Sequence, residues 1–507
     1  MKDDRAKRSY QDILKSTSVI GSASVVNIGI GLVRFKVAAL LLGPAGVGLI
    51  GLLQNLMTSA SSVSALGFAN AGTRQIAEAR GTDDAQALAV ARKALFLGSL
   101  LMAIIGGTVF WVLREQIART VLGDPSLSAV VGWLAPGVAI AVMAGSQGAL
   151  LNGLRRIGDI ARLSILSALL SALLGVGGLV IFGDKGIVIF VLSVPLSGWL
   201  FGRWFVSRLP KNQTAPTPVG ELHEQWKILV KLGSAFMIAG LAVTAGQLVV
   251  RVLVKQELGA EALGYFQAAW MISMTYVGLV LGAMGADYYP RLTATIRDHA
   301  VTNRLVNEQT EVALWLAGPL LLAMLGLAPW VIELLYTSEF GDAARVLRWQ
   351  LLGDILKVAS WPLGFILLAL GDGRIFMLKE SMVMIVFVGL VSLGLPHFGI
   401  QATGAAFLGM YLFNLPLLLW LARRRTGFVW ERRVVFQILA LMLAALIVFI
   451  VSVYSSLLSA VFGLSASFIA GFIALARLSP DVNPDSFVGR CAGRSRGLMN
   501  RLGIWCD

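Results

Sequence analysis

Long stretches without a charged residue dominate the chain and alternate with shorter polar segments. A helix needs about 20 residues to cross about 30 Å of hydrocarbon, and most of these stretches approach or exceed that length. Three of them, 37–73, 381–422 and 434–476, can hold parts of two helices. The others are 16–33, 94–113, 125–154, 163–183, 186–202, 232–250, 262–286, 312–332 and 358–371. The pattern predicts an all-α polytopic membrane protein.

Helix-breaking residues divide the three longest stretches: Gly43-Pro44, Pro396-His397-Phe398-Gly399 and Ser455-Ser456. With these breaks the sequence predicts twelve helices up to about Arg425 and two more within 426–477. The first apolar stretch continues through Leu42 without the small-residue cleavage site of a signal peptide. We therefore expect an uncleaved first helix.

Composition and charge placement give the orientation. Of 507 residues, 57% are apolar and 14% charged, whereas soluble domains carry about 25% charged residues, which excludes a soluble enzyme. Cytoplasmic loops of membrane proteins carry an excess of Lys and Arg. With the N-terminus inside, predicted inner segments hold 32 of the 42 Lys and Arg, outer loops hold 6, and 4 lie within helices. The net charge of +14 is thus a topology signal; we expect both termini in the cytoplasm and no nucleic-acid partner.

The sequence contains no hydrolase triad, P-loop or His/Cys metal cluster. Its two cysteines, Cys491 and Cys506, lie in the predicted cytoplasmic tail, where a disulfide is not expected. The expectation is a transporter and not an enzyme, with no catalytic residues, no metal and no cofactor. Coupling to H⁺ or Na⁺ stays open.

Features of the first half recur about 217 residues later. The matching pairs are Arg34 and Arg251, Arg74 and Arg291, and Leu42-Gly43 and Leu258-Gly259. Each half holds six predicted helices, an even number, so the repeats enter the membrane in the same sense. The predicted parts are an N-lobe at 1–207, a cytoplasmic linker at 208–226, a C-lobe at 227–425, two extra helices at 426–477 and a cytoplasmic tail at 478–507. Two six-helix lobes around a midplane site favour alternating-access transport.

Four basic residues within predicted helices are candidates for substrate binding: Arg34, Lys36, Arg251 and Lys357. A charge at membrane depth costs from about 2.5 to more than 10 kcal/mol and normally faces the bundle interior or water. Arg34 and Lys36 lie in the outer half of the first helix, and Arg251 lies at the matching place on the seventh. Arg251 either faces a cavity or snorkels to the interface. Lys36 is two residues from Arg34 and points away from it, so one of the two faces something other than the substrate.

The tenth predicted helix carries Asp354 and Lys357, three residues apart on one face. They form either a self-neutralising ion pair or a titratable carboxylate beside a cation. Asp287, at the end of the eighth helix, is a second ion-coupling candidate or an ordinary interfacial acid. Gln54 and Asn55 place amide groups at membrane depth, which either hold helices together or bind substrate hydroxyls.

Two motifs carry a family resemblance. The stretch Leu41-Leu42-Gly43-Pro44-Ala45-Gly46-Val47-Gly48, followed by Gln54-Asn55-Leu56, is similar to the opening of Wzx-type polysaccharide flippases of the multidrug/oligosaccharidyl-lipid/polysaccharide (MOP) exporter superfamily. Residues 349–358, Trp-Gln-Leu-Leu-Gly-Asp-Ile-Leu-Lys-Val, resemble the branch that moves a lipid-linked common-antigen repeat unit. The resemblance covers roughly 13–425, and the two extra helices depart from the twelve-helix pattern of that branch.

The resemblance implies a MATE-like two-lobed fold and a substrate, undecaprenyl diphosphate carrying an oligosaccharide. This lipid would move from the inner to the outer leaflet of the bacterial inner membrane, for O-antigen, common-antigen or exopolysaccharide synthesis. Implied partners are membrane lipids, a polysaccharide polymerase and a chain-length regulator. A diphosphate needs cations at its site, and Arg offers bidentate contacts to phosphate.

The alternatives are a MATE-type multidrug/ion antiporter and a peptidoglycan lipid II flippase. A cation-drug exporter should have an acidic cavity, whereas the charges on the first and seventh helices are basic. A membrane-bound glycan polymerase or ligase would be expected to carry a large periplasmic loop, and every predicted outer loop is short.

Overall fold

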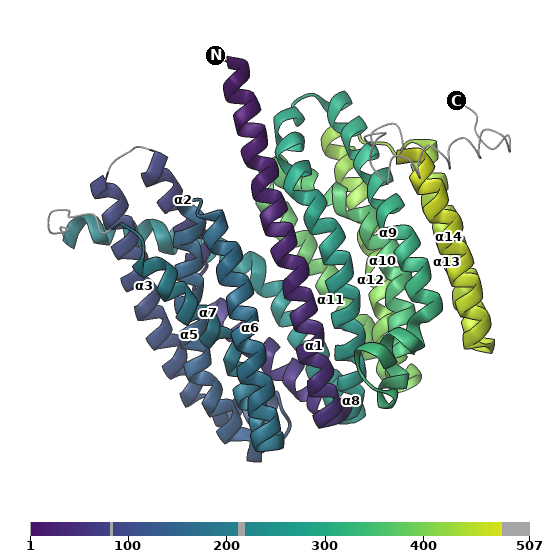
Figure 1. The fold of residues 1–507 in the computed structure, drawn as a ribbon, viewed down its shortest axis with the longest axis horizontal. Coiled ribbons are helices and arrows are strands. Elements are labelled where there is room, and N and C mark those ends of the chain that lie inside the picture. Colours follow the sequence, from purple (N-terminus) through teal and green to yellow (C-terminus); the bar gives the residue numbers. More distant parts are fainter. Residues whose placement is uncertain (1, 82–84, 211–218, 479–507) are drawn as a thin grey trace. The chain divides into compact units, whose positions relative to one another are not determined.

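The computed structural model describes residues 2–81, 85–210 and 219–478, and in this part of the chain all regular structure is helical (Figure 1). The first half holds α1 (Lys2–Ser64), α2 (Phe68–Gly81), α3 (Ala85–Val112), α4 (Arg114–Thr120), η1 (Pro125–Leu127), α5 (Ser128–Gly153), α6 (Ile157–Phe182), η2 (Gly183–Gly186) and α7 (Ile187–Ser207). The second holds α8 (Val219–Thr295), α9 (His299–Leu335), η3 (Ser338–Phe340), α10 (Gly341–Ala369), α11 (Gly373–Phe398), α12 (Gln401–Thr426), α13 (Arg432–Tyr454) and α14 (Ser456–Leu478). The two cysteines of the predicted tail lie outside the described residues.

Eleven segments of the described chain are long and apolar enough to cross a membrane. Three of them contain two helices each: Gly21–Ser64 bends at Gly43, Gly240–Gly285 bends at Gly259, and Ile157–Ser207 comprises α6 and α7. The described chain therefore has enough apolar helix for fourteen passes, the number that the charge-free stretches predict. The all-α polytopic prediction is confirmed.

The predicted helix breaks occur where the sequence placed them. Gly43 has φ 61°, a left-handed conformation that glycine adopts without steric cost, and Pro44 resumes the helix. α11 ends at Phe398 before Gly399, whose φ is 54°, and α13 gives way to α14 at Ser455. Gly259, the repeat mate of Gly43, breaks α8 in the same way with φ 88°.

The chain forms two compact units. Unit 1 comprises residues 1–267 and 335–339, and unit 2 comprises 268–334 and 340–507. The boundary between the units falls between Gln267 and Ala268, inside the expected C-lobe at 227–425, and α8 begins at Val219 inside the expected linker. The part of the linker at 211–218 lies outside the described residues.

Each unit has its own packed interior. In unit 1, α6 packs against α7, α3 against α5, and α1 against α6, with a core around Phe68, Leu95 and Leu151 (Figure 1). In unit 2, α12 packs against both α10 and α11. The phenol of Tyr288 on α8 donates a hydrogen bond of 3.0 Å to the carbonyl of Pro362 on α10.

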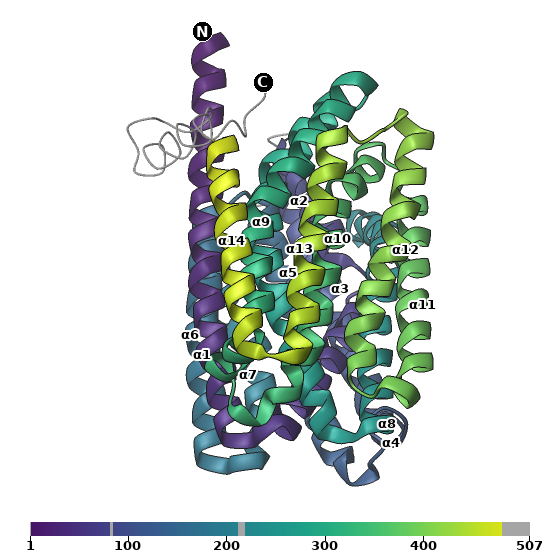
Figure 2. The ribbon, with the colours of Figure 1, turned by 90° about the vertical axis from the view of Figure 1, so that its right-hand side faces the viewer.

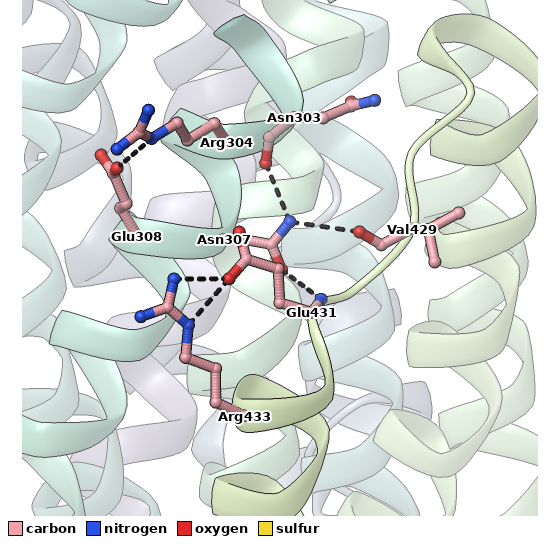
Figure 3. Close-up of polar contacts among 7 residues, drawn as sticks. All are labelled: Asn303, Arg304, Asn307, Glu308, Val429, Glu431 and Arg433. Carbon is pink, nitrogen blue, oxygen red and sulfur yellow. Dashed lines mark hydrogen bonds and ion pairs between the residues drawn. The ribbon is translucent and has the colours of Figure 1, made fainter. Parts of the chain in front are cut away.

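The two extra helices form a hairpin, α13–α14, drawn in yellow-green and yellow (Figure 2). Its entry loop is fixed by Asn307 of α9 (Figure 3). The Asn307 amide donates to the carbonyls of Asn303 and Val429 at 2.9 and 3.1 Å, and its oxygen accepts from the Glu431 backbone at 2.8 Å. One buried side chain thus satisfies backbone groups on both sides of the loop.

Candidate functional site

Asp354 on α10 is completely buried within unit 2. Its Oδ2 accepts hydrogen bonds from the hydroxyls of Ser273 at 2.7 Å and Tyr276 at 3.1 Å, both on α8. Its Oδ1 has no hydrogen-bond partner among the described residues. The carboxylate is therefore held at one oxygen by neutral donors from another helix, while the second oxygen stays unsatisfied.

Lys357 lies beside Asp354, as the spacing predicts, but does not hydrogen-bond to it in this geometry. The Lys357 ammonium is 3.8 Å from Asp354 Oδ1, beyond hydrogen-bond distance. It also contacts the Met274 sulfur at 3.2 Å and lies 5.9 Å from the centre of the Phe407 ring. The structure thus brings the two charges together as a loose pair.

Arg34 on α1 is buried within unit 1 and turned towards α7. Its guanidinium donates to the carbonyl of Phe190 and, at 3.0 Å, to the hydroxyl of Ser193, and it lies over the Phe190 ring at 3.9 Å. Gly175 on α6 makes room for it, because a Cβ there would come within 3.1 Å of Arg34 Nε. Among the described residues no carboxylate lies within 4.0 Å of this cation, and its Nε has no hydrogen-bond partner. Arg34 is a buried charge surrounded by neutral groups.

Arg251 on α8 is also buried, with 4% of its surface exposed, so it does not snorkel to an interface here. It donates to the side chain of Gln267 at 3.2 Å and to the carbonyl of Gln247 at 3.0 Å. The bond to Gln267 joins the two parts of α8 on either side of Gly259, whereas the bond to Gln247 lies within the first part. Arg251 falls in unit 1, together with Arg34, whereas the sequence analysis placed it on a second lobe.

The other sequence-predicted residues are scattered. Lys36 donates to the carbonyl of Tyr336, so it faces a different neighbour from Arg34. Gln54 is partly buried, and Asn55 keeps a buried amide oxygen without a hydrogen-bond partner among the described residues. Asp287 is exposed and forms an ion pair of 3.1 Å with Arg291, as an ordinary interfacial acid does.

A mostly apolar cavity of about 1,120 Å³ lies in unit 1 between α1, α5, α7 and α8. Asp124, Asp184, Lys185 and Lys255 are its charged lining residues, and none of the sequence-predicted site residues lines it. No sequence motif marks this cavity, because most of its lining residues are apolar and come from four separate segments of the chain.

The sequence did not predict the hydroxyl groups that contact Asp354, nor the residues of α7 that contact Arg34. A weak signal exists for the first: Ser273 and Tyr276 are three residues apart, on one face of an otherwise apolar helix. Chemically, unit 2 offers a buried carboxylate that can exchange a proton or an ion pair, and unit 1 offers a buried guanidinium that can take an anion.

Comparisons with known proteins identify the family and the fold of this chain. Residues 13–295, more than half of the chain, match the family described as polysaccharide biosynthesis protein. The chain is 23% identical over 435 residues to proteins named lipid III flippase from Escherichia coli K12 and Shigella flexneri, a match that covers 82% of this chain and 99% of each relative.

Among solved structures, the chain resembles the lipid II flippase MurJ in an inward closed conformation, with a TM-score of 0.69, 12% identity, and coverage of 90% of this chain and 99% of that one. It also resembles an inward-facing multidrug resistance MATE family transporter of the MOP superfamily, with a TM-score of 0.64, 16% identity, and coverage of 80% and 98%. The resemblance to Wzx-type exporters is confirmed. The expectation that the protein is a transporter and not an enzyme is confirmed with it. The chain belongs to the polysaccharide biosynthesis protein family, and its fold is that of the MOP exporter superfamily.

Proposed function

We propose that this protein is a flippase that moves an undecaprenyl-diphosphate-linked oligosaccharide from the inner to the outer leaflet of the bacterial inner membrane. Family membership and the two lipid III flippase relatives support a lipid-linked oligosaccharide as the substrate. Surface polysaccharide synthesis would consume the exported repeat unit, with a polymerase and a chain-length regulator as partners.

The observation that carries the proposal is the buried Arg34. An intramembrane cation without an acidic partner is costly, and a carbonyl and a hydroxyl offset only part of that cost. A diphosphate would supply the missing negative charge through charge-assisted hydrogen bonds. In the described conformation Arg34 is buried and the Phe190 ring covers its guanidinium, so a substrate would reach it when α1 moves against α7. Alternating access provides such a movement.

Asp354 is the carboxylate that we assign to energy coupling. Asp287 does not fit this role, because an exposed surface ion pair contributes little and does not sense the membrane interior. A single carboxylate can carry a proton, whereas Na⁺ needs several oxygen ligands and would lie beside the Lys357 ammonium. The arrangement favours H⁺.

The proposal is tested by depleting the protein in cells that make its surface glycan. Surface glycan should fall while the lipid-linked intermediate accumulates and stays inaccessible to reagents added outside intact spheroplasts. Re-expression should reverse both effects. Export of a small cationic drug that depends on this protein, with normal surface glycan after depletion, would favour the MATE-type antiporter.

A further inference from the structure

A break in the helical backbone separates α1 from α2 at residues 65–67. Leu66 and Gly67 both adopt left-handed conformations, with φ 46° and 67°. Such a conformation is costly for leucine and is a feature of functional sites more often than of regular packing. At membrane depth, non-helical backbone is tolerated where it is buried in protein or lines a cavity. The break at residues 65–67 lines a cavity.

The cavity beside the break has a volume of about 260 Å³ and lies wholly within unit 1. Its polar lining residues are Ser61, Ser62, Asn70, Ser99 and Ser146, and its lining includes no charged residue. Ser99 is 1% exposed, and its hydroxyl has no hydrogen-bond partner among the described residues. Its lining is thus neutral, with hydroxyls, an amide and one unsatisfied buried donor.

Two glycines keep this cavity open. A Cβ at Gly240 of α8 would meet nothing within 4 Å, and one at Gly145 of α5 would meet only the Cβ of Ala69, at 3.9 Å. Neither glycine has a left-handed φ. Glycine inside a helix costs about 1 kcal/mol relative to alanine, and neither backbone conformation nor packing requires it at these positions. What both glycines supply is empty space inside the cavity.

We propose that this cavity binds one neutral sugar ring of the transported glycan and contributes to substrate specificity. The inference rests on the proposed function. A diphosphate needs cations, which this cavity lacks, whereas a sugar ring presents hydroxyls that match serine and asparagine side chains. The volume is below the roughly 300–1,000 Å³ of pockets for drug-sized ligands, which fits a single ring and not a chain of several. Phe68, which also lines the cavity, offers an apolar ring to the sugar.

The cavity lies where the candidate span Gly21–Ser64 ends and α2 begins. Ser61 and Ser146 donate to carbonyls of their own helices at 3.0 and 2.9 Å, which leaves their oxygens able to accept from sugar hydroxyls. The Ser99 hydroxyl, which has no hydrogen-bond partner among the described residues, is the donor that we assign to the sugar.

The test measures equilibrium binding to the full-length protein in lipid nanodiscs. The three probes are undecaprenyl diphosphate and the same lipid carrying one N-acetylglucosamine or one galactose. For the native protein, at least one sugar-bearing probe should bind about tenfold more tightly than undecaprenyl diphosphate. Gly145→Val, which fills the cavity, should abolish that difference, and Ser99→Ala should reduce it severalfold. Binding of the bare diphosphate should be unchanged in both variants.

Gly198→Val is the matched control, because a Cβ at Gly198 of α7 would also meet only an alanine Cβ, that of Ala144, at 3.9 Å. This variant should keep the full sugar difference. Equal binding of all three probes by the native protein, or a retained sugar difference in Gly145→Val, would overturn the sugar site while leaving the flippase proposal intact. Failure of the native protein to bind any of the three probes would instead overturn the proposed function. Thermal unfolding in detergent identifies a variant that is merely misfolded.

Discussion

At the scale of single residues, neutral groups stabilise the two buried charges Arg34 and Asp354. Arg34 relies on a carbonyl, a hydroxyl and an aromatic face, and Asp354 relies on two hydroxyls of α8. The sequence identifies both charges, since a charge stands out in an apolar stretch. It does not identify Ser273 as a partner of Asp354, because serine is common in apolar helices and the two residues are 81 positions apart. Charges are predictable here, and their partners are not.

Replacing Arg34 tests whether this cation serves the substrate. A charge-assisted hydrogen bond is worth about 1.5–3 kcal/mol, so Arg34→Ala should weaken binding of undecaprenyl diphosphate by roughly ten- to a hundredfold. Arg34→Lys should keep part of the affinity, because the charge survives while the bidentate fork is lost. The measurement is surface glycan and inner-leaflet intermediate in cells that express each variant at matched levels. Normal glycan with Arg34→Ala would contradict the role.

Variants of Asp354 and Lys357 distinguish a role in energy coupling from mutual charge neutralisation. If neutralisation were their main role, the double change to Asn and Met should be milder than either single change, because one unpaired buried charge is worse than none. Lys357 makes no hydrogen bond to Asp354, and we assign Asp354 to coupling, so we expect the double variant to be as inactive as Asp354→Asn. A complementation assay with all three variants, at equal membrane abundance, measures this. Recovery of activity in the double variant would favour the structural role.

At the scale of elements, the internal repeat shows in the way α1 and α8 bend. Gly43 and Gly259 stand at matching places, and each interrupts its long helix with a left-handed φ. The sequence predicted the break at Gly43 and matched Gly259 to it through the repeat, but the break at Gly259 itself was not predicted. It predicted α13 and α14 from their apolar length but said nothing of how they dock. Their docking depends on Asn307 and Gln437, whose amides are unremarkable until the helices lie together.

Asn307→Ala should loosen the α13–α14 hairpin. The change leaves the carbonyl of Val429 and the backbone amide of Glu431 without this partner, and each lost hydrogen bond costs about 0.5–1.5 kcal/mol (Figure 3). We expect a lower unfolding temperature in detergent and faster proteolysis at the loop 427–431. Arg304→Ala on the same helix removes only an exposed ion pair with Glu308 and should change little. Equal stability of Asn307→Ala and the native protein would show that packing alone holds the hairpin.

At the scale of the whole molecule, the sequence predicted the number and kind of helices but not the cavities. Charge-free length is a local property of the chain, and it determines how many times the chain can cross a membrane. The cavity at the break between α1 and α2 is lined by residues from α1, α2, α3, α5 and α8, which only folding brings together. Serines, glycines and an asparagine from five helices form no motif along the chain. The function was therefore predicted from the family resemblance, whereas the cavities could be located only in the structure.

Orientation is the whole-molecule property that the sequence predicts most directly. An even number of passes would place both ends of the described chain on one side, and the excess of Lys and Arg in the predicted inner segments predicts that this side is the cytoplasm. Cys491 and Cys506, which follow the last described helix, should react with a membrane-impermeant thiol reagent only after the inner membrane is opened. In a variant with both cysteines replaced, Gln116→Cys on the exposed face of α4 should react in intact spheroplasts, because α4 lies in a predicted outer loop. Labelling of the native cysteines in intact spheroplasts, with protection of Gln116→Cys, would invert the orientation. An inverted orientation would also contradict the proposed direction of transport.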